Sequence, residues 1–383
     1  MTAYFDANAT TPMLPEAREE WLQVSGHYWC NPSGLYPEAG KARELLEGFR
    51  EELAEMLGCP AKRVVFTAGA TEANNAVIAH AARGGGRVAV SAIEHASVSE
   101  SAQHLIGREC LIEIGVTRGG VVDLAGLQAV LSGKALELVS IMAANNETGV
   151  LQPWRDAASL CRERGVAFHC DAAQWIGKQG LTGFQQCDFV TASAHKFGGP
   201  PGVGFLLVPE EGQFRGQVGG PQERGARGGT ENLPAIAAML TALRQAPAGI
   251  SGAARDRFEK DLLDCLPGVR LLGAEESRLG NTSMLVLPAH KNLRWLTRLG
   301  SRGVAVSTGS ACSAGKGDPS RVMQAMGCSF EEMGRVLRVS ALPSASREDW
   351  ETLLDALLEV RDELAQTGGG EVSGVRKISL ENL

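Results

Sequence analysis

The sequence predicts an α/β protein, with a large domain built on a mostly parallel seven-stranded sheet flanked by helices and with a smaller α/β domain. Between residues 64 and 208, seven short runs rich in apolar and β-branched residues recur, and segments with helical spacing separate most of them. Such alternation is typical of a mostly parallel sheet with helices on both faces. After about residue 255 this pattern changes, which indicates a second, smaller unit.

The individual elements follow from residue spacing. Residues 38–58 place leucines, a phenylalanine and a methionine at helical spacing and predict a helix with one face in the core. Helices are also expected over 123–131 and 155–165, the latter ending at a glycine. The expected strands are VVF (64–66), VAV (88–90), CLIEI (110–114), LVSIMA (138–143), VAFHC (166–170), DFVTAS (188–193) and GFLLV (204–208).

The same patterns set the expected domain boundaries. We expect the large domain over 15–255 and the smaller domain over 1–14 together with 256–367. Residues 368–383 contain a glycine-rich stretch without periodicity, so we expect a mobile tail there.

Composition excludes several classes of function. The chain has 383 residues, 44% of them hydrophobic, and a net charge of -7, which gives no general attraction to nucleic acid or anionic lipid. No run reaches the roughly 18 apolar residues of a membrane helix, and the N-terminus lacks a signal-peptide pattern. We therefore expect a soluble, cytoplasmic protein with no membrane partner and no direct nucleic-acid partner.

The cysteines point away from disulfides and metal sites. They number nine, are scattered, and form no C-x-x-C pair, so neither a disulfide framework nor a zinc site is expected. Most are expected to be buried as small apolar residues. Cys312 differs, because it lies in VSTGSACSAGKGDPS (306–320), where serine, glycine and alanine leave little for it to pack against.

Polar residues gather directly after the predicted strands. In an open α/β sheet, ligands bind outside the carboxyl ends of the strands. After the first strand, a glycine turn precedes Thr71 at a helix start, which suits a phosphate or a carboxylate. The polar residues that follow the later strands are Glu94, His95, Asn145, Asn146, Glu147, Asp171, Gln174, Ser193, His195 and Lys196.

Together these residues match what pyridoxal phosphate requires. Its aldehyde needs a lysine for a Schiff base, its pyridine nitrogen needs an acidic partner, and its phosphate needs a cradle of N–H groups. Lys196, Asp171 and the turn before Thr71 could supply these three. Taken alone, Lys196 could equally be a surface lysine, and His95 a structural hydrogen-bonding group.

Ten motifs along nearly the whole chain carry a family resemblance. The chain resembles the class V, fold-type I pyridoxal-phosphate enzymes, and within them the cysteine desulfurases of the NifS/IscS-like group. The motifs are YFDANATTP (4–12), CNPSG (30–34), VVFTAGATEANN (64–75), IEHASV (93–98), NNETGV (145–150), HCDAAQ (169–174), SAHKFGGPPGVG (193–204), RGGTEN (227–232), STGSACS (307–313) and LRVS (337–340).

The resemblance implies a role for each site residue. Lys196 would be the Schiff-base lysine, Cys312 the nucleophile, and His95 would stack on the cofactor ring and move protons. Asp171 would pair with the pyridine nitrogen and Gln174 with the ring hydroxyl oxygen. The other implied contacts are Ala70, Thr71, Ser193 and His195 to the phosphate, Thr230 to the phosphate from a second subunit, Asn146 to cofactor or substrate, and Asn31 and Arg338 to the substrate carboxylate.

The resemblance also implies a reaction and partners. L-cysteine would give L-alanine and a persulfide on Cys312, which a homodimeric enzyme would pass to an acceptor protein for iron-sulfur cluster assembly or thiolation. A small sulfur carrier and a DNA-sulfur system are further possible acceptors. An unperturbed thiol has a pKa near ~8.5, so Cys312 would need activation to attack as a thiolate.

The sequence departs from the family pattern at three places, and it leaves alternative functions open. Tyr36 and Pro37 stand where a histidine is frequent, Ala194 replaces a glycine, and SALPSAS (340–346) replaces the usual segment after Arg338. A selenocysteine lyase, an aminotransferase or a cysteine lyase would keep the lysine and the aspartate but would not need Cys312. A non-catalytic scaffold would need none of them. A nicotinamide-binding protein is excluded because no G-x-G-x-x-G follows the first strand.

Overall fold

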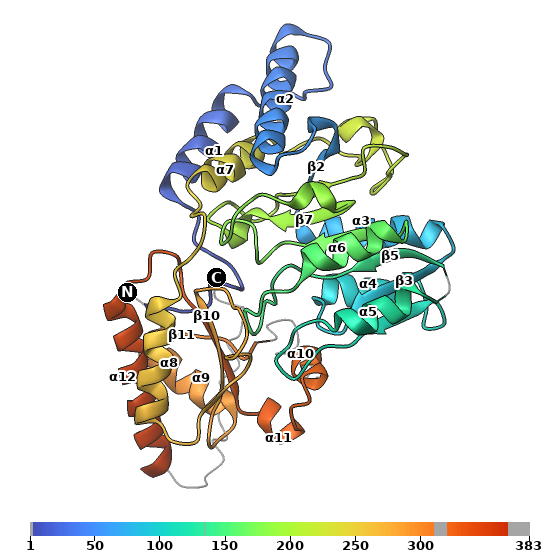
Figure 1. Ribbon diagram of the computed structural model, residues 1–383. Helices are drawn as coiled ribbons and strands as arrows, with labels where there is room; N and C mark the ends of the chain where they lie inside the picture. The colour runs from blue at the N-terminus through green and yellow to red at the C-terminus, as the bar shows by residue number, and fades with distance from the viewer. Residues whose placement is uncertain (1–2, 134, 310–319, 367–383) are drawn as a thin grey trace, which may run out of the picture.

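A seven-stranded sheet forms the centre of the large domain (Figure 1). The computed structural model describes residues 3–133, 135–309 and 320–366. Strand β8 runs antiparallel to both of its neighbours, and all other adjacent pairs are parallel. In spatial order the strands are β2 (Val64–Thr67), β8 (Gly204–Leu207), β7 (Phe189–Ser193), β6 (Ala167–Asp171), β5 (Leu136–Ser140), β3 (Arg87–Ser91) and β4 (Leu111–Ile114). Each overlaps one of the seven expected runs, so the predicted sheet is confirmed.

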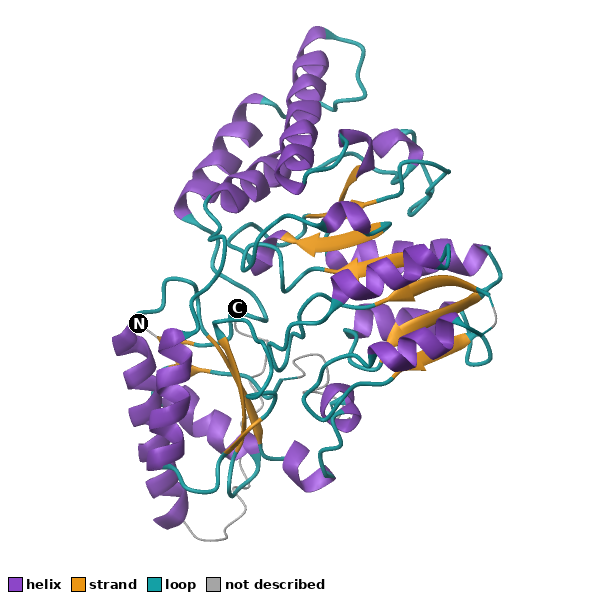
Figure 2. Cartoon of the chain, in the orientation of Figure 1, coloured by secondary structure: helices purple, strands orange, loops and turns teal. Residues whose placement is uncertain are grey.

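Helices cover both faces of this sheet (Figure 2). On one face lie α3 (Ala70–Arg83) and α4 (Ala96–Leu105). On the other lie α1 (Pro15–His27), α2 (Pro37–Leu57), α5 (Leu124–Leu131), α6 (Trp154–Glu163) and α7 (Leu233–Arg244). Side chains along β3 alternate between the two cores, since Val88 and Val90 pack with α3 and α4 while Ala89 packs on the opposite face. The three helices expected from spacing correspond to α2, α5 and α6 within two residues at each end.

Short turns of 3-10 helix connect several of these elements. The turn that matters most for the site is η3 (Ala194–Lys196), which follows β7 directly. The others are η1 (Ala61–Arg63), η2 (Phe184–Gln186) and η4 (Gln222–Gly225).

The smaller domain has its own sheet and core. Strands β9 (Arg270–Leu271), β10 (Thr282–Val286) and β12 (Val336–Ser340) form an antiparallel sheet with β10 in the middle. Strand β1 (Ala3–Tyr4) pairs in parallel with β11 (Val304–Ala305). The helices are α8 (Ala253–Cys265), α9 (Asn292–Ser301), α10 (Arg321–Ala325), α11 (Phe330–Met333) and α12 (Arg347–Gln366). Phe5, near the start of the chain, packs in this core. The boundaries at 15 and 255 stay predictions, and the expected tail over 368–383 lies outside the described residues.

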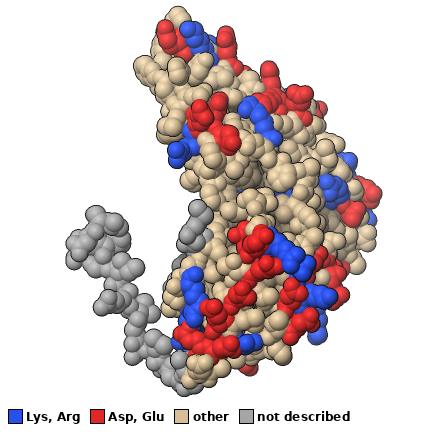
Figure 3. All heavy atoms as spheres, turned by 90° about the vertical axis from the view of Figure 1, so that its left-hand side faces the viewer, with Lys and Arg blue, Asp and Glu red and all other residues tan. Residues whose placement is uncertain are grey.

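A fourth apolar cluster joins the two domains. Ile93 and Met142 from the large domain pack with Met284, Val286 and Val322 from the smaller one. Ion pairs lie at the outer helices: Arg298 of α9 and Arg302, which follows it, bind Glu363 of α12. Figure 3 shows acidic and basic side chains close together on this side of the molecule. Among the described helices, none is both long and apolar enough to cross a bilayer.

Candidate active site

A cavity of about 880 Å³ lies between the carboxyl ends of the large-domain strands and the smaller domain. The turns after β2, β3, β5, β6 and β7 all contribute to its wall, as the sequence predicts. The smaller domain closes it with residues such as Gly309, Ser320 and Arg338. Ten of the predicted site residues line this cavity: Ala70, Thr71, His95, Asn146, Asp171, Gln174, Ser193, His195, Lys196 and Arg338.

Three predicted site residues are not placed in this cavity. Asn31 is exposed in the loop between α1 and α2, where its side-chain oxygen accepts the Ser33 backbone N–H at 2.9 Å. Thr230 is exposed just before α7. Cys312 lies outside the described residues. The last described residue before it, Gly309, and the first after it, Ser320, both line the cavity.

Asp171 ends β6 as a buried carboxylate with a fixed orientation. Its Oδ2 accepts the Asn74 side-chain N–H at 2.8 Å, and its Oδ1 accepts the Ala173 backbone N–H at 2.9 Å. The Asn74 amide is itself oriented, because its oxygen accepts the Thr191 hydroxyl at 2.6 Å. A carboxylate held in this way can accept one more hydrogen bond, from a ligand in the cavity.

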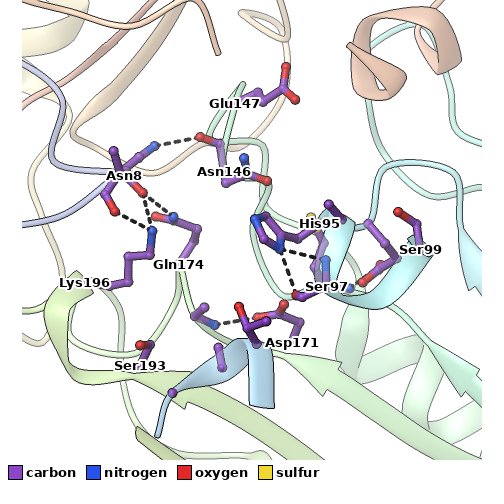
Figure 4. A pocket seen from close by; sticks show the side chains of 18 of the residues that line it. Asn8, His95, Ser97, Ser99, Asn146, Glu147, Asp171, Gln174, Ser193 and Lys196 are labelled. Atoms are coloured by element: carbon purple, nitrogen blue, oxygen red, sulfur yellow. Dashed lines mark hydrogen bonds between the residues drawn. The ribbon is translucent and has the colours of Figure 1, made fainter. Parts of the chain in front are cut away.

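His95 begins α4 and is held as a neutral ring. Its Nδ1 accepts the Ser97 backbone N–H at 3.1 Å and lies 2.8 Å from the Ser97 hydroxyl (Figure 4). The same hydroxyl also accepts an N–H of Asn74. Burial lowers the pKa of His95, the nearby Lys196 lowers it further, and Asp171 partly opposes this. Because Nδ1 is an acceptor, the ring proton lies on Nε2. Asn74 therefore links the orientation of Asp171 to that of His95.

Lys196 is positioned by the N-terminal segment of the chain. Its Nζ donates to the backbone carbonyls of Asn8 and Ala9, both at 2.8 Å. The Asn8 carbonyl also accepts the Gln174 Nε2–H at 2.9 Å, so two site residues share one acceptor (Figure 4). The amine and the amide thus lie side by side in the cavity wall.

The start of α3 forms a cradle suited to a phosphate. Gly69 precedes the helix with φ near +145°, and a Cβ there would come within 3.1 Å of the Ser193 hydroxyl. A glycine thus keeps open the space in front of the helix, whose first N–H groups have no partner within the helix. Beside this space, burial and the nearby Lys196 lower the pKa of His195 to about 4, so its ring is neutral at physiological pH.

Arg338 on β12 provides a cation in the wall of the cavity. It is buried, and its Nη2 donates to Asp6 Oδ1 at 2.6 Å. Its Nη1 donates to the carbonyls of Asn146 and Gly309, both at 3.0 Å. Its Nε–H has no hydrogen-bond partner among the described residues. Because Arg338 lines the cavity, its guanidinium supplies positive charge for a carboxylate bound there.

The structure adds residues that sequence reasoning did not single out. Asn8, Asn74 and Lys178 form hydrogen bonds to predicted site residues. Asn8 and Asn74 lie within quoted motifs, and Lys178 lies four residues after one. Glu94 is among the polar residues that follow the predicted strands, but the sequence assigns it no chemical role. It lines the cavity, and burial raises its pKa to about 8.

The prediction that most cysteines are buried holds for only half of the eight that the structure describes, since Cys59, Cys110 and Cys328 are partly exposed and Cys265 is exposed. Cys30, Cys161, Cys170 and Cys187 are buried, and all eight described cysteines are unpaired. Burial raises the pKa of Cys161 to about 12 and raises that of Cys170 far above its ordinary value. Such thiols are poor nucleophiles at neutral pH.

Comparisons with known proteins show which family this chain is similar to. The family model described as aminotransferase class-V matches residues 3–353. A cysteine desulfurase of Enterobacter agglomerans is 37% identical over 349 residues, covering 88% of this chain and 87% of its own. A cysteine desulfurase of Cereibacter sphaeroides is 35% identical over 372 residues, covering 94% and 96%.

Solved structures show the same fold. A NifS-like protein from Rickettsia africae is 28% identical, with a TM-score of 0.84 over 94% of this chain and all of its own. A structure described as SspA in complex with cysteine is 29% identical, with a TM-score of 0.78 over 90% of this chain and all of its own. DndA from Streptomyces lividans is 28% identical, with a TM-score of 0.70 over 87% and 97%.

Proposed function

Since the chain belongs to the class-V aminotransferase family and, within it, to the cysteine desulfurases, we propose that it removes sulfur from L-cysteine with pyridoxal phosphate and Cys312. The products are L-alanine and a persulfide on Cys312. One observation carries this proposal: Lys196, Asp171 and His95, from three different strand ends, line the same cavity.

The residues in the cavity fit pyridoxal phosphate. When bound, this cofactor supplies an electron sink for the substrate's α-carbon. Lys196 would hold its aldehyde carbon and Asp171 its pyridine nitrogen, while Gln174 would donate to its ring hydroxyl oxygen. The cradle in front of α3 would hold the phosphate, and the space kept open by Gly69 beside the Ser193 hydroxyl supports that placement.

Two side chains are suited to move protons. Lys196 Nζ, held by two carbonyls at 2.8 Å, would take the α-proton of the substrate. His95 keeps its own proton on Nε2, because Ser97 occupies Nδ1. It can therefore donate from Nε2 to a group in the cavity.

The substrate would be bound and attacked from the smaller-domain side. Arg338, which lines the cavity, would bind the substrate carboxylate, together with Asn31. Sγ of Cys312 would attack the substrate sulfur as a thiolate. An S–S bond forms while the substrate C–S bond breaks, and the carbon fragment keeps the electron pair, is protonated and leaves as alanine.

A homodimer would complete this site. Thr230, whose predicted contact comes from a second subunit, does not line the cavity of its own chain, which supports a dimer; Asn31 also lies outside that cavity. The α1 helix and the loop after it also expose five large apolar side chains. Apolar side chains gathered in this way mark a protein interface, and a second copy would bury them. They are Trp21, Leu22, Trp29, Leu35 and Tyr36.

The persulfide would pass to an acceptor protein, such as an iron-sulfur cluster scaffold or a thiolating enzyme. This follows from the family and not from a described surface of the chain. The cytoplasmic location expected from the sequence also stays a prediction.

The direct test measures products. Protein purified with pyridoxal phosphate should release alanine and transferable sulfur from L-cysteine in equal amounts, and the bound cofactor should absorb visible light. Lys196→Ala should abolish both the products and this absorbance, whereas Lys260→Ala on the exposed face of α8 should change neither. Alanine without sulfur transfer, or a protein that does not bind the cofactor, would contradict the proposal.

A further inference from the structure

Lys178 is a fully enclosed lysine next to the site. It follows β6 by seven residues, is only 2% exposed and does not line the cavity. Burial lowers its pKa well below the ordinary value, and the nearby cations Lys196 and Arg338 lower it further. No acidic side chain forms an ion pair with it in the described part of the chain. Lysines are rarely buried without an acidic partner, so the contacts around Lys178 should explain why a lysine lies there.

The amine of Lys178 contacts two side-chain oxygens. Nζ donates to Gln174 Oε1 at 2.5 Å and to Asn8 Oδ1 at 2.7 Å. Whether charged or neutral, the amine has at least two N–H groups, one for each oxygen. In the structure both amides turn their oxygens toward Lys178 and their NH2 groups away from it.

This orientation determines which atom of the Gln174 amide is available to a ligand in the cavity. Its Oε1 is occupied by Lys178, and one N–H of its Nε2 donates to the Asn8 carbonyl at 2.9 Å. The second N–H is left for a ligand in the cavity that Gln174 lines. A flipped amide would present an oxygen there and would repel an anionic oxygen.

The hydrogen bond from Lys178 to the Asn8 side chain also helps to hold the Asn8 backbone carbonyl, which is the acceptor for Lys196. With Oδ1 held by Lys178, Asn8 Nδ2 donates to Thr282 Oγ1 at 2.9 Å and to the Asn146 carbonyl at 3.2 Å. The Asn8 carbonyl then accepts from both Gln174 and Lys196. Lys178 therefore supports two predicted cofactor contacts without touching the cavity.

We infer that Lys178 is a positioning residue that holds the Gln174 amide with its NH2 group toward the cavity, so that Gln174 can donate to the ring hydroxyl oxygen of pyridoxal phosphate. The inference rests on the proposed function, because it concerns that cofactor. It extends the site to a buried residue that acts only through Gln174 and Asn8.

The test is a double-mutant cycle read on the bound cofactor. Cofactor is removed from wild type, Lys178→Met, Gln174→Ala and the double variant, and each is then titrated with pyridoxal phosphate while affinity and visible spectrum are recorded. We expect Lys178→Met to weaken binding roughly tenfold, the scale of one hydrogen bond to an ionised group, and to shift the visible band. Gln174→Ala should produce the same shift, and adding Lys178→Met to it should add little.

A control separates positioning from stability. Arg63 is also a buried cation, but it donates to the carbonyls of Val208, Cys187 and Asp188, away from the cavity. Arg63→Met should lower stability and leave the cofactor spectrum unchanged. If Lys178→Met does not fold, Lys178→Gln, whose chain is one atom shorter, is measured by the same criteria.

Two results would overturn the inference. One is a folded Lys178 variant with the wild-type affinity and spectrum. The other is an effect of Lys178→Met that is just as large in the Gln174→Ala background, which would mean that Lys178 acts on Lys196 through its charge. Failure of wild type to bind the cofactor would instead contradict the proposed function itself.

Discussion

Glu94→Gln should change how the stability of the protein depends on pH. Glu94 is 4% exposed, and its Oε1 accepts the Ser91 hydroxyl at 2.5 Å and the Met142 backbone N–H at 2.8 Å. Its Oε2 has no partner among the described residues. Burial raises the pKa of this carboxyl from 4.5 to about 8, so Glu94 is protonated at neutral pH in the folded protein.

The sign of the effect follows from the two pKa values. The folded state binds a proton that the unfolded state has released between pH 4.5 and about 8, so stability falls as pH rises through this window. The difference between the two pKa values corresponds to roughly 4 to 5 kcal/mol of unfolding free energy. This stabilisation is fully present below pH 4.5 and is lost above about pH 8. Glutamine keeps the two accepted hydrogen bonds and has no proton to lose.

The assay is urea unfolding of cofactor-free wild type and variant from pH 5 to pH 9, followed by tryptophan fluorescence. Trp154 and Trp175 lie in the core of the large domain, which also contains Glu94, so their fluorescence reports the unfolding of that domain. The variant should gain several kcal/mol relative to wild type between the two pH limits. The control Glu331→Gln, at a side chain that is 81% exposed, should show a constant difference. A constant difference for Glu94→Gln would refute the reasoning.

Three further predictions test the site. Asp171→Asn should retain cofactor but lose roughly 100-fold or more in turnover, because it removes the charge opposite the pyridine nitrogen; unchanged turnover would contradict this. Asn74→Ala should cost roughly tenfold in turnover by freeing Asp171 Oδ2, and a visible spectrum identical to wild type would argue against that role. Mixing Lys196→Ala with Thr230→Val subunits should restore activity above either alone, since one site of the mixed dimer is complete; no recovery would place Thr230 in its own chain's site.

Most of the large-domain fold was predictable because it depends on local patterns. Apolar runs of strand length, with helical segments between most of them, located all seven strands, and the residues after five of these strands line one cavity. The antiparallel direction of β8 was not specified, because nothing in GFLLV distinguishes its direction from that of its neighbours. The pairing of β1 with β11 joins residues about 300 positions apart, and no local spacing encodes it.

The supporting shell of the site was less predictable than the site itself. Lys196 and Asp171 carry chemistry that a motif can indicate. Asn8 and Lys178 act through hydrogen bonds to residues up to 188 positions away, or through an amide whose orientation only the folded chain sets. Glu94 resembles any polar residue after a strand, and only its burial reveals that it keeps a proton.

The most direct test of the central claim is the mass of the protein after incubation with L-cysteine. We predict a gain of about 32 Da, one sulfur atom, located on the peptide that contains Cys312, and its absence in Cys312→Ala and in Lys196→Ala. A protein that consumes L-cysteine without this gain, or that carries it on another cysteine in the Cys312→Ala variant at the wild-type rate, would contradict the account.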